Sequence, residues 1–391
     1  MSEGTLTGVK VLDLTDERAI YGAKLLADLG ADVVRPEPPD GDPLRQRGPF
    51  HSQAETDVAS LYYAFFGSSR RSVTLDLQQD QGRRQLRQLA GAADIVLLCE
   101  GGFGTAHLDL GQLRQQHPKL VVIETNSLGK TGPWRDYAAP DFVAGALGGA
   151  VATTGDVDTP PLKAFGELNF MVSGAYVGIA ALAALYSAGR DGEGESASVS
   201  VHECIASCLE QVLMFYWYAD VMQRPEGAVL PRRGSTHWSN AFTVMNGQDG
   251  SIMITPTPDF DRQLAWLIEE DAHGDLIDPK YAEPENLALL IGRTMELLGE
   301  WVSSKEVEAL FYDGQARHMP YGWVQPLARI GDNPQLQARN WFTEIALGNA
   351  SVNSTGAPYR FSDSSWSMSG QQAAGMDTQA VLDDIGWGGS A

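Results

Sequence analysis

The sequence predicts an open α/β fold with a parallel sheet, on three observations. Residues 8–14 (GVKVLDL), 21–29 and 31–35 have the patterns of a strand, a helix and a strand, and this order within about 30 residues is typical of a βαβ unit. Two further apolar strand patterns follow at 94–98 and 119–125, separated by helical segments. The chain has 391 residues, which is enough for two domains and a sizeable core.

The first helix ends at a glycine, and the first strand lacks a nucleotide fingerprint. Leu25, Leu26 and Leu29 share one face of the predicted helix, and Gly30 follows them, as glycines often follow helix ends. No GxGxxG stands between this strand and this helix. A nicotinamide-dependent enzyme is therefore not expected.

A proline- and glycine-rich loop, residues 36–50 (PEPPDGDPLRQRGPF), follows the second strand and carries Arg45 and Arg47. Its composition favours a solvated loop. Its place after a predicted parallel strand also allows an anion site, because open α/β sheets bind ligands at the carboxyl ends of their strands. The residues by themselves leave both interpretations open.

The central stretch 170–188 carries no charge and is rich in small residues. Its length is close to the roughly 20 apolar residues that span a bilayer, but no aromatic or basic flank accompanies it. A helix that is apolar all round is more often buried in a large soluble domain. Close packing on both sides, or a subunit contact, is predicted from its small residues Gly174, Ala175, Gly178, Ala180 and Ala181.

The later part of the chain predicts a smaller domain. Residues 221–240 are irregular and mark the change of domain. An Asn-Gly and an Asp-Gly step predict a hairpin that pairs 242–245 with 251–254. Residues 258–313 are largely helical in pattern.

Composition and charge exclude several classes of partner. The net charge of −22 argues against nucleic acid or an anionic membrane as a partner, since both require a basic face.

The N-terminus, MSEGTLTGVKVLDL, lacks the features of a signal peptide. Cys99, Cys204 and Cys208 form no CxxC pair, so buried thiols are expected rather than a metal site. We predict a cytoplasmic, reducing setting and no metal.

Several ordered motifs carry a family resemblance. They are GVKVLDL, LLADLGADVV, PEPPDGDPLR, SSRRSVTLDL, SLGKTGPW, DFVAGALGG and, at 190–203, RDGEGESASVSVHE. Together they resemble the family III CoA-transferases of the CaiB/BaiF type, which include formyl-CoA transferase and 2-methylacyl-CoA racemase. The resemblance covers nearly the whole chain. It implies an open Rossmann-like large domain plus a smaller α+β domain, in an interlocked dimer.

The same resemblance implies how the chain is divided. Residues 1–220 resemble the N-terminal part of the large domain, and 221–325 resemble the small domain. Residues 326–391 resemble the segment that returns to complete the large domain. The family binds CoA or acyl-CoA as a substrate, so no permanently bound cofactor is expected.

The resemblance also implies which residues face CoA. The motifs that frame its nucleotide and adenine in the family contain or directly adjoin Arg35, Glu37, Arg45, Arg70, Arg71, Thr74 and Leu75. Gly234 matches the glycine-rich loop that closes over the thioester. At 99–103 the chain reads CEGGF where the family reads N-F-R-P-G. Glu100 would repel a phosphate there.

The catalytic aspartate of the family is missing. Its position corresponds to Asn169 or Phe170, and an amide cannot act as nucleophile and leaving group in turn, as covalent CoA transfer requires. Glu167 lies two residues away, and Asp141 matches an acidic position near the thioester, so each is a possible substitute. Pro140 stands where the racemases place a His, so the racemase base is also missing.

We therefore predict a non-catalytic subunit of a heteromeric family III CoA-transferase, of the benzylsuccinate type. A homologous subunit that carries the aspartate would be its partner, and an acyl-CoA and a carboxylic acid, possibly a substituted succinate, its substrates. One alternative is an active homodimeric CoA-transferase, or an acyl-CoA racemase, that uses Glu167 or Asp141. The other is a non-enzymatic CoA-binding or scaffold protein.

Overall fold

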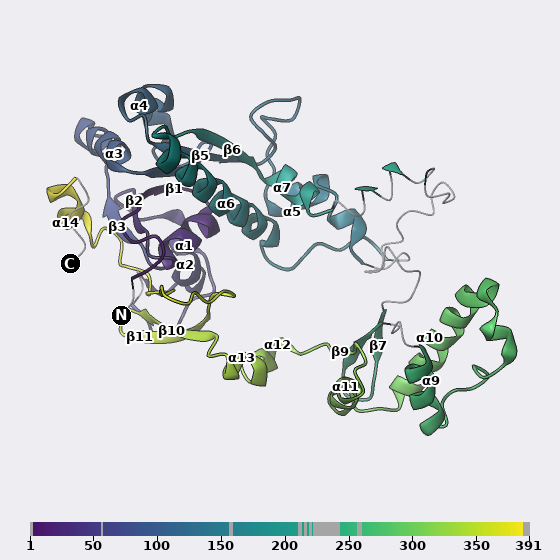
Figure 1. The fold of residues 1–391 in the computed structure, drawn as a ribbon. Helices are drawn as coiled ribbons and strands as arrows, with labels where there is room; N and C mark the ends of the chain where they lie inside the picture. The colour runs from purple at the N-terminus through teal and green to yellow at the C-terminus, as the bar shows by residue number, and fades with distance from the viewer. Residues whose placement is uncertain are drawn as a thin grey trace. The chain divides into compact units, whose positions relative to one another are not determined.

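The computed structural model describes residues 3–55, 58–155, 159–209, 213–214, 217–218, 221, 243–255 and 260–385. Its contacts divide the chain into two compact units (Figure 1). The first unit comprises Met1–Ala150, Lys163–Leu209 and Pro334–Ala391, and the second comprises Val151–Leu162 and Glu210–Asn333. The first unit therefore combines three separate stretches of the chain.

A six-stranded sheet in the order β3-β2-β1-β4-β5-β6 forms the centre of the first unit. Its strands are β1 (Lys10–Leu14), β2 (Asp32–Glu37), β3 (Arg71–Thr74), β4 (Ile95–Cys99), β5 (Val121–Asn126) and β6 (Ser196–Ser200). Every neighbouring pair is parallel, and Val11 lies opposite both Val33 and Ile95. The predicted open α/β fold is confirmed. The strand order reverses between β1 and β4, and sheets of this kind bind ligands at such a point.

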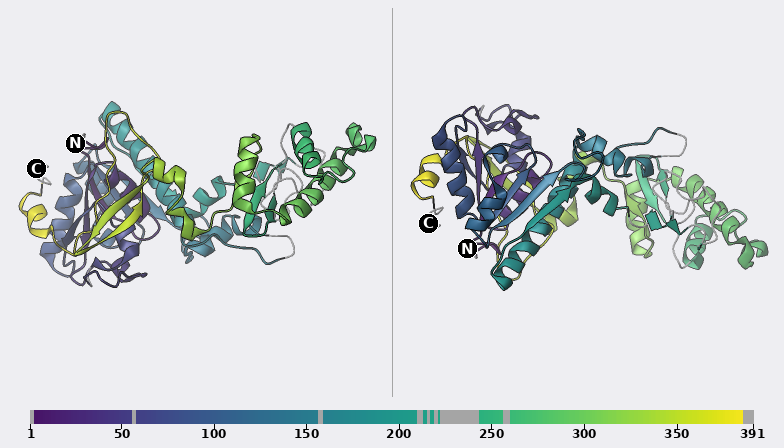
Figure 2. Two further views of the ribbon diagram at one scale, coloured as in Figure 1. Left: turned by 90° about the horizontal axis from the view of Figure 1, so that it is seen from below. Right: turned by 90° about the horizontal axis from the view of Figure 1, so that it is seen from above.

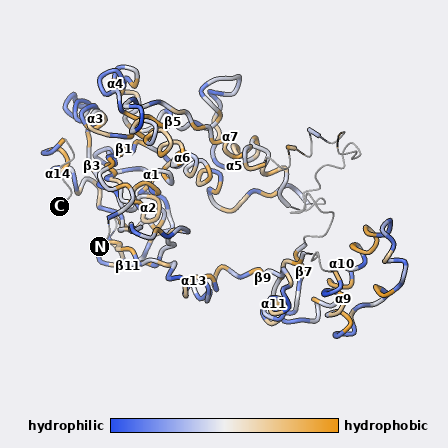
Figure 3. Tube along the Cα trace, in the orientation of Figure 1, coloured by the Kyte–Doolittle hydropathy of each residue, from blue (hydrophilic) through white to orange (hydrophobic). Residues whose placement is uncertain are grey.

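Helices cover both faces of this sheet (Figure 2). The four main ones are α1 (Ile20–Asp28), α3 (Asp80–Ala92), α4 (Leu110–Gln116) and α6 (Leu168–Asp191). Val11 and Ile95 share a core with α1 and α6, whereas their neighbours Leu12 and Val96 share the opposite core with α3 and α4. This split follows from the alternation of side chains along a strand. The outer turns of α3 and α4 are hydrophilic (Figure 3).

Two glycines let α6 approach α1 closely. A Cβ on Gly174 would lie 2.8 Å from the Cβ of Tyr21 and 2.9 Å from the backbone nitrogen of Gly22. A Cβ on Gly22 would lie 2.6 Å from the carbonyl oxygen of Gly174. The close backbone approach predicted from the small residues of α6 is thus confirmed on this face.

The opposite face of α6 is apolar and exposed. Ile179 is 63% exposed and Tyr186 is 74% exposed, and Tyr176 and Leu182 lie on the same side. By length and composition alone, α6 could cross a membrane, although core helices pass the same test. Its packing against α1, α7 (Val201–Ser207), β5 and β6 makes one face part of the core of the first unit.

Replacing Gly174 by Ala should destabilise the first unit, because the added methyl group meets the backbone of α1. Overpacking of this kind typically costs about 1–3 kcal/mol. Gly189→Ala on the same helix is the matched control, since nothing lies within 4 Å of its Cβ position and alanine favours a helix by about 1 kcal/mol. Urea unfolding measures both. A Gly174→Ala variant as stable as the parent protein would contradict this account of the α1–α6 contact.

The first unit has further short elements outside the six-stranded sheet. They are η1 (Pro43–Gln46), α2 (Leu61–Phe66), η3 (Thr105–His107), α5 (Asp141–Leu147), α13 (Pro334–Ala338), the hairpin β10 (Phe342–Leu347) and β11 (Ala350–Thr355), and α14 (Thr378–Asp383). The C-terminal stretch covers the edge strand β3. The backbone nitrogen of Ser72 donates to Asp377 at 2.8 Å, and that of Thr74 donates to the hydroxyl of Thr378 at 2.9 Å.

The second unit is a small α+β unit with its own core. Its elements are η4 (Val151–Thr153), β7 (Thr243–Asn246), β8 (Ser251–Ile254), α9 (Phe260–Glu269), η5 (Pro279–Ala282), η6 (Pro284–Asn286), α10 (Leu287–Ser303), α11 (Val307–Ala316), β9 (Gly322–Trp323) and α12 (Leu327–Ile330). β7 and β8 form an antiparallel hairpin, one residue away from the predicted start. Within the core, Trp266 stacks on Tyr321 and meets Trp301 edge to face.

Candidate functional site

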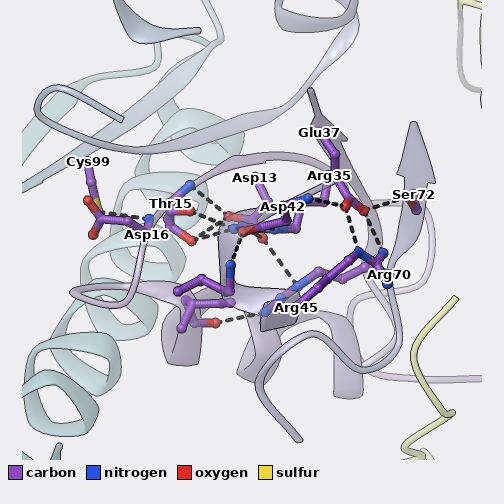
Figure 4. A network of polar contacts seen from close by, with 12 residues as sticks. Asp13, Thr15, Asp16, Arg35, Glu37, Asp42, Arg45, Arg70, Ser72 and Cys99 are labelled. Carbon is purple, nitrogen blue, oxygen red and sulfur yellow. Dashed lines mark hydrogen bonds and ion pairs between the residues drawn. The ribbon is translucent and has the colours of Figure 1, made fainter. Parts of the chain in front are cut away.

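The carboxyl ends of β1 and β2 place a buried arginine between two buried carboxylates (Figure 4). Arg35 donates through Nη1 to Asp13 at 2.9 Å and through Nε to Asp42 at 2.7 Å. Its Nη2 donates to the carbonyl oxygen of Thr15 at 2.9 Å. All three guanidinium nitrogens of Arg35 are thus engaged within the chain.

The charge of Asp13 is stabilised in this buried position. Burial alone would raise the pKa of Asp13, but the charges of Arg35 and Arg70, with a hydrogen bond from Thr15, outweigh it and lower the pKa below 3.8. Arg70 lies with its Nε 3.3 Å from Asp13 Oδ2 and donates through Nη2 to the carbonyl oxygen of Ile20 at 2.7 Å. Arg70 therefore faces the interior.

A second ion pair, between Glu37 and Arg45, lies beside the first (Figure 4). Arg45 donates through Nε and Nη2 to the two carboxylate oxygens of Glu37, at 2.7 and 2.6 Å, and Ser72 donates to the same carboxylate at 2.5 Å. The guanidinium of Arg45 stacks 4.3 Å from the ring centroid of Tyr63. Burial would raise the pKa of Glu37, but the hydrogen bonds and charge of Arg45 lower it.

The other residues expected to face CoA lie in different surroundings. Arg71 is partly exposed and pairs with Asp32, with Nε 2.9 Å from Oδ1. Thr74 lies against the C-terminal stretch, and the side chain of Leu75 belongs to the core beneath α3. Gly234 lies outside the described residues.

An amide–carboxylate pair joins the N-termini of α5 and α6. The side chain of Asn169 donates through Nδ2 to Asp141 Oδ2 at 2.8 Å, and its backbone nitrogen donates to Asp141 Oδ1 at 3.2 Å. Burial raises the pKa of Asp141, and the hydrogen bonds from Asn169 and Phe170 lower it. The effect of burial is larger, so the pKa lies above its ordinary value. A Cβ on Gly145 would lie 2.6 Å from Asn169 Nδ2, so a larger residue there would displace the amide.

Glu167 points away from this pair. Its carboxylate forms an ion pair with Arg47 and accepts a hydrogen bond from the hydroxyl of Tyr62 at 2.8 Å. The guanidinium of Arg47 stacks 4.2 Å from the ring centroid of Tyr62. Burial and the charge of Glu167 raise the pKa of Tyr62, which keeps its hydroxyl protonated as a donor.

The sequence reveals only part of the cluster formed by Arg47, Tyr62 and Glu167. Arg47 belongs to the loop for which an anion site is one of the two interpretations, and Glu167 is a predicted substitute nucleophile. Tyr62 was missed, because it precedes an apolar run, YAFF, that indicates only a core helix. The pairing itself joins residues 120 and 105 positions apart, which no local pattern can reveal.

Two cavities adjoin these groups. One of about 480 Å³ is lined by Arg47, Asp141, Glu167, Glu17 and Lys163, among others. The second, of about 210 Å³, lies at the ends of β1 and β2, and its charged lining residues are Asp13, Asp16, Glu17, Asp42 and Arg35.

The smaller cavity is unfavourable for an anion. Four of its charged lining residues are acidic, and the guanidinium of Arg35 is already shared by two of them. Burial would raise the pKa of Asp16, but hydrogen bonds from Arg18 outweigh it, so the pKa is lowered and the carboxylate stays charged. A phosphate placed there would meet repulsion rather than free donors. Within the described part of the chain, no group of three His, Cys, Asp or Glu side chains could hold a metal ion.

The first unit is a doubly wound α/β fold with buried ion pairs at the carboxyl ends of β1 and β2 and an amide–carboxylate pair at the N-terminus of α6. A sequence model of the family described as CoA-transferase family III matches residues 6–378. The chain belongs to this family, which acts on CoA thioesters without a permanently bound cofactor. The family resemblance predicted from the motifs is confirmed.

Curated relatives match almost end to end. The subunit BbsE of succinyl-CoA:(R)-benzylsuccinate CoA-transferase from Thauera aromatica is 28% identical, over 97% of this chain and 93% of the relative. Succinyl-CoA:mesaconate CoA-transferase from Haloarcula hispanica is also 28% identical, over 98% of this chain and 97% of the relative. A CAIB/BAIF family protein from Brucella suis has a similar structure, with a TM-score of 0.83, 26% identity and coverage of 98% and 100% of the two chains.

Proposed function

We propose that this chain is the non-catalytic subunit of a heteromeric family III CoA-transferase. The observation that carries the proposal is the state of the acids around the N-terminus of α6. Where the resemblance places the nucleophile, the chain has Asn169, whose amide donates to Asp141. The remaining acid, Glu167, pairs with Arg47 and Tyr62. A carboxylate already engaged by hydrogen bonds and an ion pair is a weak nucleophile.

The arginines at the sheet edge support the same proposal. Arg35, Arg45 and Arg70 have buried partners inside the chain, so a contact with a CoA phosphate would require breaking those pairs. We propose that these three residues, with Glu37, shape the edge of the sheet. Arg71, whose side chain is partly exposed, remains the expected residue best placed to contact CoA, since Thr74 lies against the C-terminal stretch.

A homologous partner subunit would supply the aspartate. The relative BbsE is named as one subunit of a CoA-transferase for benzylsuccinate, and by analogy we propose an acyl-CoA donor and a substituted succinate as acceptor. The exposed apolar stripe of α6, with Tyr176, Ile179, Leu182 and Tyr186, provides a face that a second chain could cover. The setting would be cytoplasmic.

Co-purification from the native host tests the proposal. A tag on this chain should bring down a second chain of similar size that carries the family aspartate, and only the pair should transfer CoA. Each chain expressed alone serves as the control. If this chain is recovered without a partner and transfers CoA by itself, the proposal is wrong. If a pair forms but transfers CoA between no carboxylic acids, a scaffold role is favoured.

A second candidate function is an active homodimer that uses Asp141. The raised pKa of Asp141 and its place in the lining of the larger cavity favour this alternative. It predicts that Asp141→Asn reduces the turnover of the purified chain by at least ~10³-fold, as loss of a covalent nucleophile does. Under our proposal the chain alone has no turnover to lose. Steady-state CoA transfer by the parent chain and the variant separates the two.

A further inference from the structure

The first unit contains a carboxylate-binding site that its own Glu167 fills. Tyr62 donates its hydroxyl proton to Glu167 Oε2 at 2.8 Å, and Arg47 Nη2 pairs with Oε1. Arg47 also donates through Nη1 to the Tyr62 hydroxyl at 3.1 Å. The carboxylate is thus held by a charged donor and a neutral donor that are linked to each other.

This site is fixed in place. The Arg47 guanidinium lies 4.2 Å from the ring centroid of Tyr62, which limits its rotation and orients its donors. Tyr62 is in turn packed 4.6 Å from Phe66, between ring centroids, on α2. The donors therefore stay in place when the carboxylate between them changes, which is the preorganisation that favours ligand binding.

The side chain of Glu167, by contrast, is not anchored to the helix that follows it. Glu167 is the residue just before α6, and its side chain makes no capping hydrogen bond to that helix. The side chains of Arg47 and Glu167 are 37% and 22% exposed, and both line the cavity of about 480 Å³. A carboxylate entering from this cavity can take the place of Glu167 without changing the charge facing Arg47.

We propose that Arg47 and Tyr62 recognise the second carboxylate of a dicarboxylic acid, and that Glu167 is an internal competitor that the acid displaces. The inference rests on the proposed function for its biological meaning, since it names the acid class that the site selects. A monocarboxylic acid has only the carboxylate that accepts CoA, and gains nothing from this pair. Arg47 and Tyr62 would thus determine specificity.

Calorimetric titration of the full-length chain with two probes tests this proposal. The probes are 2-phenylsuccinate and 3-phenylpropionate, which differ by one carboxylate. Arg47→Gln should weaken binding of 2-phenylsuccinate by about tenfold or more, since hydrogen bonds to charged groups contribute about 1.5–3 kcal/mol. Its effect on 3-phenylpropionate should stay within about twofold. Glu167→Gln should tighten binding of 2-phenylsuccinate, because the neutral amide competes less well for Arg47.

A second ion pair of the first unit controls for the loss of charge. Arg190 and Asp191 form an exposed ion pair at the other end of α6, and Arg190→Gln or Asp191→Asn should leave both titrations unchanged. Circular dichroism confirms that each variant is folded. Equal binding of 2-phenylsuccinate by the parent chain and Arg47→Gln would overturn the proposal. So would a Glu167→Gln variant that binds this probe as weakly as Arg47→Gln, because Glu167 would then be a support and not a competitor.

The same titrations on the co-purified complex separate this inference from the proposed function. If the complex shows no CoA transfer but retains the preference for 2-phenylsuccinate, the proposed function fails and the carboxylate site stands. If the complex transfers CoA equally well to acids with one and two carboxylates, and Arg47→Gln changes neither rate, the carboxylate site fails and the proposed function stands.

Discussion

In the proposed heteromeric complex, replacing the family aspartate of the partner subunit by Asn should reduce CoA transfer at least ~10³-fold, whereas Asn169→Ala in this chain should leave the rate within about tenfold of the parent. The first effect is expected because the covalent step needs a carboxylate as nucleophile and then as leaving group. The second is expected because Asn169 only donates hydrogen bonds to Asp141. Initial rates of CoA transfer by purified complexes measure both.

The result would separate a structural role of Asn169 from a catalytic one. Loss of the Asn169 amide removes a donor to the buried carboxylate of Asp141, so a modest loss of thermal stability should accompany the variant. Stability and rate can therefore be compared in the same preparation. A fall in rate similar to that of the partner's variant, with little change in stability, would show that Asn169 takes part in the reaction.

Replacing Arg35 by Met should lower the free energy of unfolding by about 3–5 kcal/mol, the typical cost of removing one partner from a buried ion pair. Asp13 and Asp42 would then be buried without the guanidinium that both share. Equilibrium unfolding in guanidinium chloride measures the difference. Arg190→Met is the control, since it removes an exposed pair and should not change stability measurably.

The pH dependence of stability gives a second readout of the same variant. The folded-state pKa of Asp13 lies below its ordinary value of 3.8, so this group stabilises the fold above pH 3.8, and the contribution is lost as the pH falls through the lowered pKa. Without Arg35 the pKa of Asp13 should rise, and this loss below pH 3.8 should shrink. If the Arg35→Met variant is as stable as the parent protein and loses the same stability below pH 3.8, the ion pair between Arg35 and Asp13 contributes nothing to stability.

The fold could be predicted from the sequence because its signals are local. The apolar runs of β1, β4 and β5 and the apolar face of α1 are each set by neighbouring residues, and strand–helix alternation leads to a parallel sheet with buried faces. The small residues of α6 likewise indicated a close helix contact, which Gly174 and Gly22 provide. The absence of the family aspartate at Asn169 stays a prediction from the resemblance, which rests only on the residue types around that position.

The state of the site was decided by tertiary structure. The sequence placed Arg35 and Arg45 among residues that face CoA, but could not show that the strand ends bring them against Asp13 and Glu37 inside the same unit. It offered Glu167 as a substitute nucleophile, but not its pairing with Arg47, 120 positions earlier. Partners of a buried charge are chosen by which strand ends and loops meet in space. Which strand ends and loops come together depends on the packing of the whole unit, and no local pattern in the sequence predicts it.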